Sequence, residues 1–135
     1  MNAENLILEG PGIDTLVRDL NAILTDPGHP AHAAVRVRRA DRLFSGIDRH
    51  LREGGALPVE WRVDADVSGS EDATAAYDMV SEELRSRGDV IASWRVLGEA
   101  AYWWDALTSM LTTGGPLPEP WDGRRGGSAP SPGSA

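Results

Sequence analysis

The chain of 135 residues contains no cysteine, no lysine, no glutamine and only one phenylalanine. The absence of cysteine excludes disulfides, thiolate metal sites and cysteine nucleophiles. No segment approaches the roughly 18 apolar residues that are needed to span a bilayer. Residues 1–5 lack the basic stretch and the long apolar run of a signal peptide, so a cytoplasmic protein without membrane contact is predicted.

Acidic charge is what the chain has in excess. Its formal net charge is −8 at pH 7, and all 13 basic residues are arginines. Such a chain is expected to be soluble and to avoid non-specific binding to nucleic acid or anionic membranes. Residues 33–54 hold six arginines against three acids, whereas residues 64–105 hold ten acids against three arginines. This opposite charge predicts that the asymmetry either helps the two copies to pack or keeps them soluble.

One sequence pattern occurs twice, sixty residues apart. Residues 51–61 and residues 111–121 both read L-x-x-G-G-x-L-P-x-x-W, which indicates a duplicated structural unit. In each copy the glycine pair is expected to close a helix, because glycine adopts the left-handed conformation at little steric cost. Proline then extends the chain. Trp61 and Trp121 are therefore predicted to fold back as lids over the ends of the helices.

Four segments carry apolar residues at helical spacing. Segments 37–51 and 97–111 share the spacing 3, 4, 3, 4 of a seam that packs helix on helix, and segments 13–24 and 73–84 precede them. A single hairpin is too small to bury its seam, so the predicted fold is all-α, a four-helix bundle of two tandem helical hairpins. The predicted parts are an N-terminal arm (1–12), a first hairpin with its lid (13–62), a linker (63–69), a second hairpin with its lid (70–123) and a disordered tail (124–135).

Three adjacent aromatic residues, Tyr102, Trp103 and Trp104, lie in the predicted fourth helix. They fan across about 200° of a helix and cannot all face one core stripe. Trp104 matches the seam residue Phe44 of the first copy and is predicted to be core. Tyr102 matches Arg42 and is predicted to face outward, while Trp103 flanks the core.

The predicted partner-binding surface combines aromatic anchors with acidic side chains, since Tyr and Trp are favoured anchors at interfaces and charge speeds encounter. Its residues are Tyr102, Trp103, Trp94, Asp78, Glu82 and Glu83. Two alternatives stay open. The apolar residues 6–8 of the arm would cover the rings, or the acids would form an ordinary solvated helix face.

Two groups of side chains suggest metal chemistry. His29, His32 and Asp26 resemble a fragment of a zinc site, which would need a fourth ligand such as His50; a solvated turn is the favoured interpretation. The helical acids invite comparison with all-helical nucleotide pyrophosphohydrolases, which collect magnesium through E-x-x-E or E-x-x-D pairs. No such pair occurs in the third and fourth helices. No catalytic residue, metal site or cofactor is predicted, and a metal-dependent hydrolase is kept as an alternative.

The arginine-rich second helix raises the alternative of nucleic-acid binding. Four of its arginines fall roughly on one side: Arg38, Arg42, Arg49 and Arg52. Arginine contacts phosphate well, but Asp41, Asp48 and Glu53 stand at salt-bridge spacing among these arginines, and the whole chain is acidic. Direct binding to nucleic acid is therefore not expected. An acidic face that imitates nucleic acid is a further alternative.

The helix ending that runs from Gly114 to Trp121 resembles that of small uncharacterised proteins of actinobacteria and their phages. The resemblance covers about the last third of each copy. It implies a mobile-element or accessory protein and carries over no functional residue. Together with the surface above, it leads us to expect a non-enzymatic interaction protein, that is, an adaptor, inhibitor or accessory subunit. A homo-oligomer is the remaining alternative.

Overall fold

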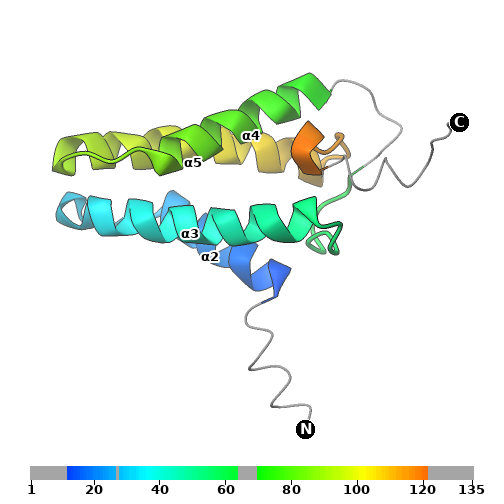
Figure 1. Cartoon of the computed structure of the whole chain (residues 1–135), viewed down its shortest axis with the longest axis horizontal. Coiled ribbons are helices and arrows are strands. Elements are labelled where there is room, and N and C mark those ends of the chain that lie inside the picture. Colours follow the sequence, from blue (N-terminus) through cyan, green and yellow to red (C-terminus); the bar gives the residue numbers. More distant parts are fainter. Residues whose placement is uncertain (1–11, 27, 64–69, 122–135) are drawn as a thin grey trace, which may run out of the picture.

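The computed structural model describes residues 12–26, 28–63 and 70–121, and every regular element in these ranges is helical. The elements are helix α2 (Ile13–Thr25), the short 3-10 turn η1 (Pro30–His32) and helices α3 (Ala33–Arg52), α4 (Ser70–Arg85) and α5 (Val90–Thr112). The prediction of an all-α bundle is confirmed (Figure 1). The predictions for the arm up to residue 11, for linker residues 64–69 and for the chain from residue 122 lie outside the described residues.

Helices α4 and α5 begin where polar residues satisfy or complement their free N–H groups. Asp89 precedes α5, and its carboxylate accepts a hydrogen bond from the backbone N–H of Ala92 at 2.9 Å. This arrangement satisfies one of the donors that a helix start leaves unpaired. Glu71 and Asp72 lie in the first turn of α4, where negative charge interacts favourably with the helix dipole.

The glycine pair ends α3 and α5 in the same way. Gly54 and Gly114 adopt the left-handed conformation, with φ of 83° and 100°. The next residue in each copy then donates its N–H to the carbonyl oxygen of the fifth residue before it: Gly55 to His50 at 2.9 Å, and Gly115 to Met110 at 2.7 Å. These are the hydrogen bonds of a glycine-closed helix end, as the repeat predicts.

The second helices of the two copies, α3 and α5, pack against each other and form the centre of the bundle (Figure 1). Helix α2 contacts α3 and α5, and α4 contacts α5 and α3, whereas α2 and α4 do not touch. The α2–α5 groove of the molecule therefore corresponds to the α3–α4 groove, with the two copies exchanged. This correspondence allows the two grooves to be compared residue by residue at an offset of sixty.

The predicted lids are buried and meet each other. Trp61 and Trp121 stack with their ring centroids 5.8 Å apart and an angle of 17° between planes. Phe44 lies beneath them, 6.3 Å from the Trp121 ring, and also contacts Tyr77 and Trp104. Burial of large aromatic side chains contributes strongly to core stability. The lids thus join the two copies instead of covering each helix end separately.

Backbone contacts repeat at the same offset. The Val59 N–H donates to the Asp14 side chain at 2.9 Å, and the Glu119 N–H donates to the Thr74 hydroxyl at 2.8 Å. Each of these bonds ties the segment after the glycine pair to the first helix of the same copy. Contacts that recur sixty residues apart are the structural counterpart of the duplicated pattern.

The ion pair that links the two copies does not follow the charge asymmetry of the sequence. Within the described ranges, the ion pair between the two copies joins Arg87 of the acidic second copy to Asp41 of the arginine-rich first copy, at 3.1 Å. Attraction between the two regions would pair arginines of the first copy with acids of the second, whereas this pair joins an acid of the first copy to an arginine of the second. The reason is that most arginines of α3, such as Arg38, Arg42 and Arg49, are exposed to solvent instead of facing the second copy.

Candidate interaction surface on helix α5

Helix α5 carries an exposed apolar stripe on the side away from the core. Ile91, Trp94, Gly98 and Tyr102 follow at spacings of three and four, which places them along one side of the helix. Ile91 is 77% exposed, Trp94 38% and Tyr102 66%. Large apolar side chains gathered on one exposed face often mark a site of interaction. We call this row the α5 stripe.

The three adjacent aromatic residues separate as predicted. Trp104 is buried, and its indole N–H donates to the side-chain oxygen of Asn21 on α2. Trp103 is half-buried and packs against the core. Tyr102 meets the Trp103 ring edge to face, with centroids 5.0 Å apart. The half-buried Trp103 ring therefore packs against the Tyr102 ring, while Tyr102 itself remains exposed.

The acidic residues of the predicted surface lie on a different helix. Asp78 and Glu82 are exposed on α4, and Glu83 is half-buried there. No ion pair involves any of the three within the described residues. The structure brings Tyr102 and Trp103 together, whereas these acids lie on the neighbouring helix α4.

Sequence reasoning missed Ile91, which belongs to the stripe. The predicted partner-binding surface also leaves out two acids on this side of the molecule. Asp105 follows Tyr102 by three residues on the same side of α5 and is exposed. Glu60 stands across the adjoining groove, next to the lid residue Trp61. The sequence could have identified Ile91, because this apolar residue lies outside the 97–111 seam and is therefore not expected in the core.

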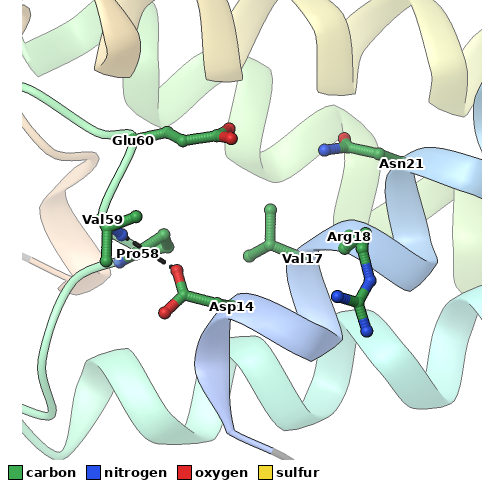
Figure 2. Close-up of a pocket in the computed structure, with 7 residues that line it drawn as sticks. All are labelled: Asp14, Val17, Arg18, Asn21, Pro58, Val59 and Glu60. Atoms are coloured by element: carbon green, nitrogen blue, oxygen red, sulfur yellow. Dashed lines mark hydrogen bonds between the residues drawn. The ribbon is translucent and has the colours of Figure 1, made fainter.

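Three adjoining hollows along α2 share Asn21 in their walls, and two of them lie between α2 and α5. The largest, about 400 Å³, has Glu60, Trp61, Asp105 and Thr112 among its lining residues. A second, about 210 Å³, lies at the start of α2. Figure 2 shows this second hollow, with the Glu60 carboxylate and the Asn21 side chain pointing toward one another across it.

The corresponding α3–α4 groove is filled by a polar cluster. Asp48 Oδ1 accepts hydrogen bonds from the Tyr77 hydroxyl at 2.8 Å, from Trp121 Nε1 at 2.8 Å and from Arg52 Nε at 3.0 Å. Arg52 Nη2 also donates to the Tyr77 oxygen at 2.6 Å. Burial, followed by the hydrogen bond to Asp48, raises the pKa of Tyr77 above its ordinary value. We call Asp48, Arg52, Tyr77 and Trp121 the Asp48 cluster.

The suggested zinc fragment is an exposed turn. His29 Nδ1 accepts a hydrogen bond from the Ala31 N–H at 3.0 Å, and His32 is exposed. His50 lies near the other end of α3, about 27 Å of helix away at 1.5 Å per residue, so it cannot join them. In the ranges that the structure covers, no three His, Asp or Glu residues are grouped so that they would hold a metal ion.

Comparison of the chain with protein-family models, with curated proteins and with solved structures gives no match. The resemblance of its helix ending to actinobacterial and phage proteins therefore stays a prediction. Within residues 12–26, 28–63 and 70–121, no helix is both long and apolar enough to cross a membrane.

Proposed function

We propose that this protein is a non-enzymatic interaction module that binds another protein along α5. The observation that carries the proposal is the α5 stripe, where Ile91, Trp94 and Tyr102 are exposed on one side of a helix whose opposite side is core. From Ile91 to Tyr102 the stripe is about 17 Å long, at 1.5 Å per residue. This length suits a helix or loop of a partner.

Two further features support this use of the stripe. Trp103 packs beneath Tyr102, so the exposed ring is held in place before binding and loses little conformational freedom when a partner arrives. Asp105 lies at one end of the stripe, and Asp78 and Glu82 extend acidic charge onto α4. Acidic charge around an apolar patch speeds encounter with a basic partner. In this proposal the protein acts in the cytoplasm as an adaptor, inhibitor or accessory subunit, and a phage or mobile-element origin fits that role.

The test is affinity purification from the native host with Trp94→Ala/Tyr102→Ala as bait. We expect this variant to lose a partner that the unchanged protein retains, because aromatic anchors usually dominate interface energy. The matched control is Val35→Ala, which removes an exposed apolar side chain outside α5 and should keep the partner. Far-UV circular dichroism checks that both variants remain helical. Equal retention by the two variants contradicts the proposal.

Two measurements separate this function from its alternatives. A homo-oligomer through the stripe would appear in light scattering as a mass above that of the 14.5 kDa monomer, and Trp94→Ala/Tyr102→Ala would dissociate it. A metal-dependent nucleotide hydrolase would release or absorb heat when titrated with magnesium or manganese. The adaptor should remain monomeric alone and show no such heat.

A further inference from the structure

One difference between the two corresponding grooves concerns arginine: Arg52 of the chain itself lies in the α3–α4 groove, whereas no arginine of the described residues lines the two hollows between α2 and α5. Arg52 donates from Nε to both oxygens of Asp48, at 3.0 and 3.1 Å, and from Nη2 to the Tyr77 hydroxyl. Its guanidinium carbon lies 5.8 Å from the centre of the Tyr77 ring. A carboxylate and an aromatic ring therefore hold a guanidinium group at this end of the bundle.

Smaller residues stand at the corresponding places of the α2–α5 groove. Subtracting or adding sixty pairs Tyr77 with Val17, Arg52 with Thr112, Asp48 with Thr108 and Trp121 with Trp61. The loss of the tyrosine ring and of the arginine side chain accounts for the hollow of about 400 Å³ there. The indole wall is kept, since Trp61 lines this hollow.

Carboxylates are also present, but from other positions. Glu60 and Asp105 both line the hollow, and no arginine or histidine is among its lining residues. Neither acid takes part in an ion pair in the described part of the chain. Arg18, which borders the neighbouring hollow, lies 3.9 Å from Asp19 and points away from Glu60 in Figure 2. The groove thus has the wall and the charge for a cation without holding one.

We propose that the α2–α5 groove binds an arginine side chain of the partner protein, in the manner in which the α3–α4 groove holds Arg52. The guanidinium group donates to Glu60 and Asp105 beside the part of Trp61 that lines the hollow, since a planar guanidinium pairs with carboxylates. Asp105 also borders the α5 stripe, so a partner that lies on Tyr102 reaches the groove directly. The inference rests on the proposed function and adds the basic residue that the partner must carry.

The first test needs no partner. The ¹⁵N-labelled full chain is titrated with acetyl-arginine amide, and the indole N–H signals are followed by NMR, with Trp-to-Phe variants for assignment. We expect the Trp61 signal to move, whereas those of Trp104 and Trp121, which are hydrogen-bonded inside the bundle, stay in place. Acetyl-citrulline amide has nearly the same shape without the charge and should leave Trp61 unmoved. Equal shifts with both probes, or no shift with arginine, overturn the proposal.

Charge variants locate the site. Glu60→Gln should weaken binding of the arginine probe about fivefold, because it removes one partner of a charge-assisted hydrogen bond. The matched control is Glu99→Gln, which makes the same charge change at an exposed position of α5 that does not line the groove. If the two variants weaken binding equally, the attraction is only that of an acidic surface and the groove is not the site.

A filling variant tests the correspondence between the grooves. Thr112→Arg places an arginine at the position that corresponds to Arg52, and it should weaken binding of the probe at least tenfold by occupying the groove. Thr113→Arg adds the same charge one residue further on and should weaken binding far less. Equal weakening by the two variants contradicts the proposal.

Two outcomes distinguish binding of a partner's arginine from binding of the chain's own arginines and from the proposed function alone. If Arg124→Ala/Arg125→Ala tightens binding of the probe severalfold, the chain's own arginines compete for the groove, and the assignment to a partner is overturned. If the probe fails to bind while Trp94→Ala/Tyr102→Ala still abolishes capture of a partner, the inference falls and the proposed function stands. If the probe binds but Trp94→Ala/Tyr102→Ala still captures the partner, the role of the α5 stripe in the proposed function falls and the arginine site stands.

Discussion

Replacing Asp48, whose side chain is 19% exposed, by alanine should destabilise the fold far more than the loss of a carboxylate on the surface. Asp48 Oδ1 accepts from the hydroxyl of Tyr77 and the indole N–H of Trp121, and both of these side chains are buried. A hydrogen bond to a charged acceptor contributes about 1.5–3 kcal/mol when its donor is left without a partner inside the protein. Arg52 is half exposed and adds less than about 1 kcal/mol. We therefore expect Asp48→Ala to lower the free energy of unfolding by about 3–5 kcal/mol.

The duplication supplies the matched control, because Thr108 occupies the corresponding position of the second copy. Its hydroxyl donates to the carbonyl oxygen of Trp104 in its own helix, at 2.9 Å, and to no side chain within the described residues. Thr108→Ala should cost no more than about 1 kcal/mol, since an intrahelical bond of this kind adds little to stability. Urea unfolding followed by far-UV circular dichroism at pH 7 measures both values.

The test is the difference between the unfolding free energies of Asp48→Ala and Thr108→Ala. If Asp48→Ala and Thr108→Ala differ by less than about 1 kcal/mol at equal m values, the Asp48 cluster does not stabilise the bundle as argued. Asp48→Asn should fall between the unchanged protein and Asp48→Ala, because its amide oxygen still accepts but carries no charge. An asparagine variant as unstable as the alanine variant would also contradict the reasoning.

Three further outcomes are expected. Burial and the hydrogen bond to Asp48 hold the pKa of Tyr77 above its ordinary value, so the folded state keeps this proton more tightly than the unfolded state. Stability should therefore fall as the pH rises above about 10, and Tyr77→Phe should flatten that fall in urea titrations at pH 8 to 11. Gly114→Ala should lose about 1–2 kcal/mol, because alanine is strained at a φ of 100°, whereas Gly98→Ala in the middle of α5 should gain up to about 1 kcal/mol in the same assay. Trp121→Ala should cost about 3–5 kcal/mol and Trp94→Ala less than about 1 kcal/mol by thermal denaturation, and similar costs would contradict their assigned burial.

The parts of the fold that were predictable are those that the sequence encodes locally. The glycine pairs, the helical registers and the outward position of Tyr102 follow from spacing along one element or from alignment of the two copies. The burial of Trp61 and Trp121 followed from the same motif. Their stacking on each other did not, because it depends on how two helix ends meet in space.

The polar contacts between helices were harder to predict than the α5 stripe, because their residues come from separate segments. The Asp48 cluster gathers Asp48 and Arg52 of α3 with Tyr77 of α4 and Trp121 of the last segment, and only knowledge of which helices adjoin assembles it. The ion pair of Asp41 with Arg87 is hidden for the same reason. One sequence signal does exist for the open groove. Aligning the copies position by position reveals that Tyr77 and Arg52 have the much smaller counterparts Val17 and Thr112.

The backbone N–H of Arg62 donates to the carbonyl oxygen of Leu111 at 2.7 Å, so the chain leaving the first copy completes the helix end of the second. We therefore expect that neither hairpin folds alone. Cutting the chain between them should yield two fragments that gain helix only when mixed. A substitution at this shared junction should therefore destabilise both copies at once. In a duplicated protein of this kind, the two copies remain similar where they contact each other, and their outer surfaces can serve different functions.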